Sequence, residues 1–384
     1  MFILIVDNGY PTKEDTRGIF SLDQAKALKS MGHKVVMVAL DLRSIRRKRR
    51  LGYRKLSVEG IDVFSVSFPL GKVPAVLSET VSKAAFGSAF KRVVQEYGTP
   101  DVIHAHFSDM GAAVSKVCRE NGIPMVVTEH SSVLNRERIP QKLLETAVRG
   151  YSDADRLIAV SESFAQRLKN NTKLDFSVVP NIVDTEVFSR VYPKKSSCEE
   201  GPFSFISVGN LLPWKGFSDL IDAFKEALDA GGRDMRLTIV GKGPEREALE
   251  KQAGELSISD KVCFKGQLKR SEIADLFAES DAFVLLSKGE TFGVVYIEAM
   301  ASGLPVIATA CGGPDGFVDS TNGILVPVGD REAYVKALLE MAGGAREFNK
   351  EAIREETLRR FSPEEIAREL TRIYEEAILV HGVS

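Results

Sequence analysis

The stretch KGETFGVVYIE, residues 288–298, holds two glutamates on either side of a turn-like segment and an apolar helix start. The paired carboxyls of a glycosidase stand roughly 5–9.5 Å apart, whereas a helix of this length spans about 12 Å. We therefore interpret Glu290 and Glu298 as separate contacts to one elongated ligand. A simpler alternative stays open, in which Glu290 caps the helix and Glu298 is solvated.

The backbone between the two glutamates indicates what that ligand is. N–H groups at a helix N-terminus favour a diphosphate, and carboxylates accept hydrogen bonds from hydroxyls. A nucleotide sugar carries hydroxyls on both sides of a diphosphate. A carboxylate on each side of a turn and a helix start therefore fits a nucleotide sugar.

A lysine occupies a second strand-to-helix loop, in SVGNLLPWKGFSDLIDAF (207–224). Lys215 can reach a phosphate held at the start of the following helix, although an ordinary loop lysine explains this stretch equally well. No G-x-x-x-x-G-K-[ST] phosphate loop is present. VGKGPER (240–246) lacks the third glycine of a dinucleotide fingerprint, which argues against a nicotinamide site.

Length and composition narrow the class of protein. The chain has 384 residues, 44% of them hydrophobic and 27% charged, which predicts a globular protein of two domains. A net charge of −2 gives the protein no overall electrostatic attraction to nucleic acid, so we expect no nucleic-acid partner. The four cysteines fit neither a zinc site nor a disulfide framework and favour a reducing compartment. With no cleavable leader after Asp7 and no run of about 18 apolar residues, we expect a cytoplasmic protein.

Short β-rich runs alternate with helical patterns along the whole chain. We predict strands at residues 2–7, 34–40, 61–67, 101–106, 124–130, 156–161 and 176–180, and then at 203–209, 236–241, 262–266, 282–287, 305–309 and 323–327. Such alternation predicts parallel sheets with helices on both faces, hence two doubly wound α/β domains. The polar, aperiodic stretch 181–202 marks the join.

Polar residues end or directly follow several of these strands. The list is His104, His106, His130, Asn210, Lys215 and residues 287–290. Ligands of open α/β sheets bind beyond the carboxyl ends of strands. Because such ends occur in both predicted domains, we expect one cleft between the domains to hold the site.

Several of these motifs together resemble the retaining glycosyltransferases of family 4. The resemblance covers nearly the whole chain and rests on the 207–224 stretch together with DVIHAH (101–106), PNIVDTEVF (180–188), LTIVGKGPEREAL (237–249), VCFKGQL (262–268), SKGETFGVVYIEAMASGLPVIATACGG (287–313) and NGILVPVGD (322–330). It implies the GT-B fold, with two doubly wound Rossmann-like domains facing across a cleft. We expect an acceptor-binding domain over 1–188, a nucleotide-sugar-binding domain over 189–362, and a C-terminal helix in 363–384 that returns to the first domain.

The resemblance also implies roles for individual residues. Glu298 would hold the donor ribose and Glu290 would lie by the donor sugar, while Lys215 would neutralise the diphosphate. The family pattern adds donor contacts from Gly18, Ser161, Asn210, Gln267, Leu268, Thr291, Phe292, Gly293 and Val294. His130 would lie near the reacting sugar, as an alternative to a satisfied loop histidine. For His104 and His106 we favour a structural role, with an acceptor contact open for His106.

Two positions depart from the family pattern. Asn210 stands where the family has arginine, and Arg17-Gly18 stands where it often has Gly-Gly. The missing cation must then come from elsewhere, and Lys288 and Arg17 are the candidates. Because the protein itself supplies cations and we see no D-x-D pair or histidine cluster placed to hold a metal, we expect no metal and no other cofactor.

A basic segment suggests where an acceptor lies. LRSIRRKRRLGYRK (42–55) contains eight cations and no acid, including Arg46, Arg47, Lys48, Arg49 and Arg50. Residues 73–94 follow with an amphipathic pattern that fits either a helix at a membrane interface or a helix packed on the sheet. We predict contact with an anionic membrane surface, hence a peripheral location on the inner face of the cell membrane and a lipid-linked glycan acceptor.

The sequence thus predicts a hexosyltransferase that uses a nucleotide-diphosphate sugar, with a UDP-sugar favoured over a GDP-sugar, in cell-surface polysaccharide synthesis. A nucleotide-sugar epimerase or a phosphorylase of the same fold remains an alternative, as does a non-catalytic nucleotide-sugar-binding membrane scaffold. The sequence indicates neither the base, the sugar, the acceptor, the linkage nor the oligomeric state.

Overall fold

The computed structural model describes residues 1–12, 17–43, 51–70, 75–189 and 201–382. The chain forms two compact units. Unit 1 comprises Met1–Ile182 together with the segment from Pro363 onward, and unit 2 comprises Val183–Ser362. The boundary therefore lies at Val183 and not at residue 189, because α6 (Thr185–Phe188) packs on α9 and α10 within unit 2.

Unit 1 is built on a sheet that, within the described residues, has eight strands in the order β3-β4-β2-β1-β5-β6-β7-β8. The strands are β1 (Phe2–Asp7), β2 (Lys34–Arg43), β3 (Gly52–Val58), β4 (Ile61–Pro69), β5 (Val102–His106), β6 (Met125–Glu129), β7 (Arg156–Ala159) and β8 (Ser177–Val178). Neighbouring strands are parallel except β3, which is antiparallel to β4. Every residue of β1 is buried, as continuous apolar strands of two-faced parallel sheets are.

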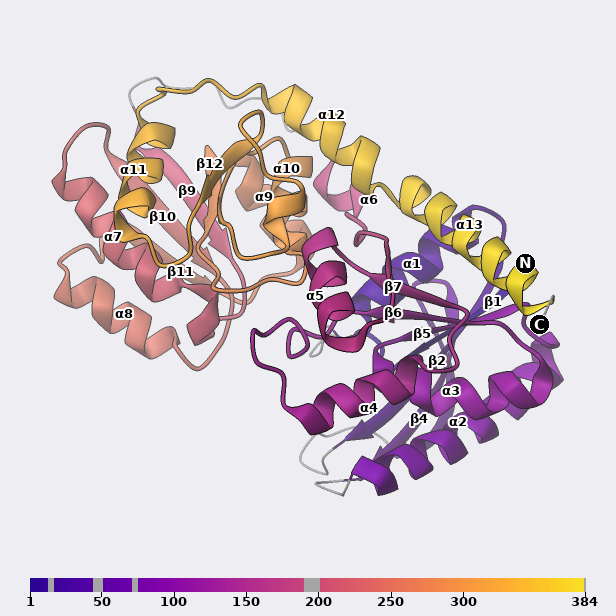
Figure 1. The fold of residues 1–384 in the computed structure, drawn as a ribbon. Coiled ribbons are helices and arrows are strands. Elements are labelled where there is room, and N and C mark those ends of the chain that lie inside the picture. The colour runs from indigo at the N-terminus through magenta and orange to yellow at the C-terminus, as the bar shows by residue number, and fades with distance from the viewer. Residues whose placement is uncertain (13–16, 44–50, 71–74, 190–200, 383–384) are drawn as a thin grey trace. The chain divides into compact units, whose positions relative to one another are not determined.

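Helices cover both faces of this sheet (Figure 1). On one face, α1 (Ile19–Ser30) packs against α13 (Pro363–His381), and residues of both helices share one apolar cluster with β1, β2 and β4. On the other face lie α2 (Ala75–Tyr97), α3 (Ser108–Asn121) and α4 (Gln141–Tyr151), with α5 (Glu162–Thr172) beside β7 and β8. The last helix thus completes the core of unit 1.

This packing decides between the two alternatives for the amphipathic segment 73–94. Its described part belongs to α2, which packs on β2, β4 and α3. Phe86 and Phe90, the largest apolar residues of the pattern, are buried at 0% and 6% exposure. The structure therefore favours the sheet-packed alternative over an interfacial helix. Residues 46–50 of the preceding basic segment lie outside the described residues.

Unit 2 contains, as far as its residues are described, a six-stranded parallel sheet in the order β11-β10-β9-β12-β13-β14. Its strands are β9 (Phe203–Val208), β10 (Met235–Val240), β11 (Val262–Gly266), β12 (Ala282–Leu285), β13 (Val306–Thr309) and β14 (Gly323–Val326). One face carries α7 (Phe217–Asp229), α8 (Arg246–Glu255) and α11 (Arg331–Ala342); the other carries α6, α9 (Arg270–Ala278), α10 (Val294–Ala301) and α12 (Lys350–Phe361). The prediction of two doubly wound α/β domains is confirmed.

No helix among the described residues is long and apolar enough to cross a membrane. The described cysteines, Cys118, Cys263 and Cys311, form no disulfide.

Candidate functional site

Two loops at the carboxyl ends of β9 and β12 bring opposite charges together in unit 2. Lys215 ends the 3-10 turn η1 (Pro213–Lys215) after β9, and Glu290 follows β12. Lys215 Nζ lies 2.6 Å from Glu290 Oε1, and the Ser287 hydroxyl donates to the same oxygen at 2.7 Å. The two charged side chains are only 20% and 11% exposed, so their attraction is less screened than at the surface. The predicted diphosphate lysine and the predicted sugar-side carboxylate therefore share one site.

The turn after Glu290 leads directly into α10. Gly293 is the N-cap of α10 with φ +96°, and an added Cβ would stand 2.7 Å from Cδ2 of Tyr296. Phe292 before it is buried, while Thr291 and Val294 are half-buried. The Glu290 carbonyl accepts from the Gly313 N–H at 3.0 Å, which ties this turn to the next loop. The first N–H groups of a helix have no intrahelical partner, so the start of α10 presents a positive end beside Lys215 and Glu290.

Glu298 lies on the second turn of α10 and is 8% exposed. Its Oε1 stands 3.5 Å from Nε of Arg270, the first residue of α9. The simple alternative of a solvated Glu298 is therefore wrong. Arg270 was not singled out from the sequence, because a lone arginine at a helix start carries no motif.

The other predicted donor residues of unit 2 flank this site along the chain. Gln267, exposed, and Leu268, half-buried, follow β11 directly, and exposed Asn210 follows β9. Lys288, a candidate for the missing cation, is half-exposed and pairs with Asp219 at 3.0 Å. Its charge is thus already opposed by a carboxylate.

In unit 1, the predicted Gly18 is the N-cap of α1 with φ +72°. A Cβ there would stand 2.5 Å from the Gly9 carbonyl oxygen, so the close approach of the two loops requires glycine. Asp7, at the end of β1, accepts from the Ser21 hydroxyl at 2.6 Å. Burial raises the pKa of the Asp7 carboxyl to about 6, against the opposing effects of Ser21, two backbone N–H groups and Arg17. The charge of Arg17, the other candidate cation, contributes the smallest of these opposing effects on the Asp7 pKa.

The histidines of unit 1 meet because of the sheet register. His106 pairs with Thr128 across β5 and β6, so His130 lies just beyond on the same side. Nδ1 of His106 is 2.9 Å from Nε2 of His130, and the rings are stacked. Their outer nitrogens, Nε2 of His106 and Nδ1 of His130, are buried without a hydrogen-bond partner in the described part of the chain. Because buried polar atoms usually have a hydrogen-bond partner, these two nitrogens are suited to bond a ligand or a water molecule.

Burial determines the charge state of this cluster. Burial lowers the pKa of His130 to about 4. It also lowers the pKa of His106, and the nearby rings of His104 and His130 lower that pKa further. His104 instead bonds Tyr374 on α13 and Thr128, each at 2.7 Å, and its pKa falls to about 3 for the same reason. His104 is thus a structural residue, and the other two are neutral imidazoles at neutral pH.

Two further residues clarify the surroundings of His130. Ser161 caps α5 by accepting from the Phe164 N–H, so its hydroxyl has a structural partner. Glu129, which sequence reasoning missed, is fully buried and accepts from the backbone N–H groups of Ser108, His130 and Ser131 and from the Tyr151 hydroxyl. A buried acid at a strand end in TEHSS is the signal that could have revealed it. Glu129 fixes the loop that carries His130.

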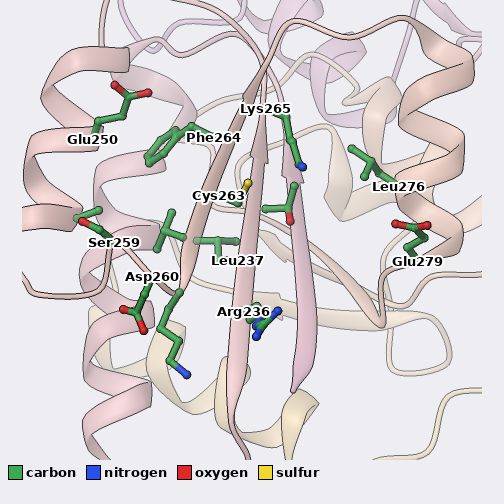
Figure 2. Close-up of a pocket in the computed structure, with 14 residues that line it drawn as sticks. Arg236, Leu237, Glu250, Ser259, Asp260, Cys263, Phe264, Lys265, Leu276 and Glu279 are labelled. Carbon is green, nitrogen blue, oxygen red and sulfur yellow. The ribbon is translucent and has the colours of Figure 1, made fainter. Parts of the chain in front are cut away.

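Unit 2 contains a pocket of about 720 Å³ (Figure 2). It runs along the edge strand β11 and the start of β10, with walls from α8 and α9. Cys263, Lys265 and Glu279 are among its lining residues, and none of the predicted site residues line it. We therefore do not assign it to the donor site.

Comparison with known families identifies the chain. A model described as Glycosyltransferase Family 4 matches residues 18–187, and one described as Glycosyl transferases group 1 matches residues 189–355. The chain belongs to glycosyltransferase family 4. The two matches together include every predicted site residue of both units.

Curated relatives of this family 4 chain act on different molecules. The N-acetyl-alpha-D-glucosaminyl L-malate synthase of Bacillus anthracis is 30% identical over 59% of this chain and 60% of its own length. The lipopolysaccharide core biosynthesis glycosyltransferase LpsE of Rhizobium meliloti is 29% identical over 49% of this chain and 54% of its own. The match thus spans between about half and three fifths of the length of these relatives.

Solved structures resemble the family 4 chain over its whole length. A sucrose-phosphate synthase from Thermosynechococcus elongatus matches with a TM-score of 0.77 at 21% identity, covering 99% of this chain and all of the other. Anabaena HepE, solved with UDP and glucose, matches with a TM-score of 0.72 at 20% identity over 98% and 99%. These likenesses show the GT-B fold.

Proposed function

We propose that the protein is a retaining glycosyltransferase that moves a sugar from a nucleotide-diphosphate sugar to an acceptor. The observation that carries the proposal is the contact of Lys215 with Glu290 beside the start of α10, with Glu298 on the same helix. A cation and a helix N-terminus suit the diphosphate, and the carboxylates suit hydroxyls of sugar and ribose. A UDP-sugar is the favoured donor, ahead of a GDP-sugar, and the solved complex of HepE with UDP supports this order.

The mechanism follows from the charges that develop at the reacting bond. Breaking the bond between the anomeric carbon and the phosphate leaves negative charge on the diphosphate and positive charge on the sugar. Lys215 and the first N–H groups of α10 stabilise the leaving diphosphate, and Glu290 orients the sugar. The acceptor attacks on the face from which the diphosphate departs, and the departing phosphate takes the acceptor proton. His130, neutral because of its lowered pKa, positions groups and does not act as a full base.

We also propose that the reaction needs no metal and no other cofactor, because Lys215 and the start of α10 supply positive charge where the diphosphate leaves. The binding assay described below is therefore run with and without EDTA. A nucleotide shift that EDTA abolishes would contradict this part.

The acceptor in this proposal is a lipid-linked glycan of cell-surface polysaccharide synthesis. The names of LpsE and of the alpha-monoglucosyldiacylglycerol synthase of Streptococcus pneumoniae, 30% identical over 44% of this chain, support that class. Leu51 and Phe68 are exposed apolar residues next to the paired residues Gly52 and Ser67 of β3 and β4. Leu51 also directly follows the basic residues 46–50 in the chain. An anionic membrane surface suits this combination, and we propose that the protein works on the inner face of the cell membrane.

Flotation with anionic liposomes tests the membrane contact. We expect the protein to float, and we expect a variant with Arg46, Arg47, Arg49 and Arg50 all changed to Ser to float less. Each basic residue near the surface contributes about 1 kcal/mol. Equal flotation of the two proteins would overturn this part of the proposal.

A thermal-shift panel of UDP, GDP, ADP, CMP and dTDP tests the donor site. A ligand at 100 times its dissociation constant stabilises by about 2.7 kcal/mol, which raises Tm by degrees. We expect a shift with a nucleoside diphosphate. No shift with any of them would remove the proposed donor and favour the non-catalytic scaffold.

The substitution Glu290→Gln and the products of the reaction together separate the remaining alternatives. We expect it to abolish most sugar transfer while nucleotide binding is retained, because Glu298 and Lys215 are unchanged. A donor converted without any acceptor would indicate the epimerase alternative, and transfer to or from free phosphate would indicate the phosphorylase. Unchanged turnover in E290Q would contradict the proposed role of Glu290.

A further inference from the structure

Arg270 occupies a position between two carboxylates of unit 2. Its Nε lies 3.5 Å from Glu298 Oε1, and one of its terminal nitrogens lies 3.8 Å from Asp184 Oδ2. The Arg270 side chain is 23% exposed, and both carboxylates are 20% exposed or less. These three groups form the Arg270 bridge.

The chain position of Arg270 links the bridge to the nucleoside end of the site. Arg270 begins α9 only two residues after Leu268, in the loop that follows β11. Gln267 and Leu268 of that loop are the residues expected to receive the base, and Glu298 is expected to receive the ribose. The guanidinium therefore lies where both parts of one nucleoside are expected.

Asp184 anchors the other side of the bridge. Its Oδ1 accepts from the Val187 N–H at 3.3 Å and caps α6, so the carboxylate is held by its own helix. Arginine is suited to this task because its planar, permanently charged group can engage two acceptors in fixed geometry. Glu298 is thereby tied, through Arg270, to the cap of α6 as well as to α10.

We propose that Arg270 is a positioning residue, which holds the Glu298 carboxylate where it accepts the ribose hydroxyls of the donor. The inference rests on the proposed function. It predicts a specific consequence: loss of Arg270 weakens the ribose contact and leaves the diphosphate contact of Lys215 intact.

The test measures binding of UDP and GDP and of their 2′,3′-dideoxy counterparts to wild type and to Arg270→Gln by calorimetry. We expect the wild type to bind the ribonucleotide more tightly than the dideoxy form. In R270Q, affinity for the ribonucleotide should fall about three- to tenfold, the equivalent of one typical hydrogen bond. Affinity for the dideoxy form should change less than twofold, because it has no hydroxyl for Glu298 to hold.

Two further variants make the result specific. Arg270→Lys keeps the charge but not the planar group, and we expect an intermediate loss. Arg331→Gln is the matched control, since Arg331 also bridges two carboxylates of unit 2, Asp222 at 3.2 Å and Glu226 at 2.7 Å, on the face that carries α11. It should leave both affinities unchanged.

The outcomes distinguish this inference from the proposed function. If wild type binds the ribonucleotide but R270Q loses equal affinity for both forms, or for neither, Arg270 does not act through the ribose and the inference is wrong. The inference is also wrong if the wild type binds the ribonucleotide and the dideoxy form equally well. If wild type binds no nucleoside diphosphate at all, the proposed function fails, and this inference fails with it.

Discussion

Ser287 is the residue that sets the position of Glu290 in the free protein. Its buried hydroxyl donates to Glu290 Oε1, the same oxygen that Lys215 contacts. We expect Ser287→Ala to lower the free energy of unfolding by about 1 kcal/mol, because a partly buried charged acceptor loses one donor. Urea unfolding measures this, with Ser280→Ala as control, since the Ser280 hydroxyl, just beyond α9, donates to the backbone carbonyl of Leu276. A loss no larger than that of S280A would contradict the role of Ser287.

His104 should make stability depend on pH. Burial holds its pKa at about 3 in the folded protein, against 6.5 for an ordinary histidine, so between these values only the unfolded chain binds the proton. Stability from this residue is therefore complete above pH 6.5 and is lost as the pH falls. We expect His104→Gln to reduce the slope of unfolding free energy against pH, between pH 5 and 6, by up to about 1.4 kcal/mol per pH unit. An unchanged slope in denaturant titrations at several pH values would show that His104 is not buried as a neutral group.

The sequence predicted those site residues that belong to a motif. Lys215, Glu290 and Glu298 could be found because strand ends, a turn and a helix start place them at one edge of a sheet. Arg270 could not, because its partners Asp184 and Glu298 are far away in the chain and only tertiary packing brings them together.

Among the elements, the turn between β12 and α10 depends most on one residue. Gly293 has φ +96°, which side chains rarely adopt, and its neighbour Tyr296 is fully buried with its hydroxyl bonded to the Leu285 carbonyl. We expect Gly293→Ala to destabilise the protein by about 1–3 kcal/mol and to weaken nucleotide binding by moving the start of α10. Urea unfolding and calorimetry are the measurements. Gly289→Ala is the control in the same loop, because its Cβ would meet open space; equal effects of the two substitutions would contradict the argument.

The strand pattern could be predicted because parallel strands buried on both faces are continuous apolar runs. The prediction missed β3, the antiparallel edge strand, whose residues Arg54, Lys55 and Ser57 are exposed and interrupt any apolar run. Its hairpin with β4 turns through Glu59 and Gly60, both at positive φ, and a glutamate is not a residue that such turns favour. The amphipathic pattern of α2 left two alternatives open because periodicity alone does not say what an apolar face contacts.

For the whole molecule, α13 is the element on which unit 1 depends. Ile366, Leu370, Ile373 and Tyr374 are buried in the same cluster as Leu22 and Leu28 of α1. We expect removal of residues 363–384 to make unit 1 sensitive to proteases while unit 2 stays resistant, because several large apolar side chains leave the core of unit 1 alone. Limited proteolysis with mass spectrometry measures this, and removal of residues 382–384 is the control. Equal resistance of both units in the longer truncation would contradict it.

The return of α13 to unit 1 also has a consequence for synthesis. A ribosome makes most of unit 1 first, then all of unit 2, and the helix that closes the first core last. Unit 2 is complete in sequence once residue 362 has left the exit tunnel, whereas the unit that began earlier still lacks its final helix. Throughout that interval the apolar side chains that α13 contacts on α1, β5 and β6 lack this partner. Exposed apolar surface of this kind is what chaperones bind. The unit whose translation begins first is therefore the unit whose core is completed last.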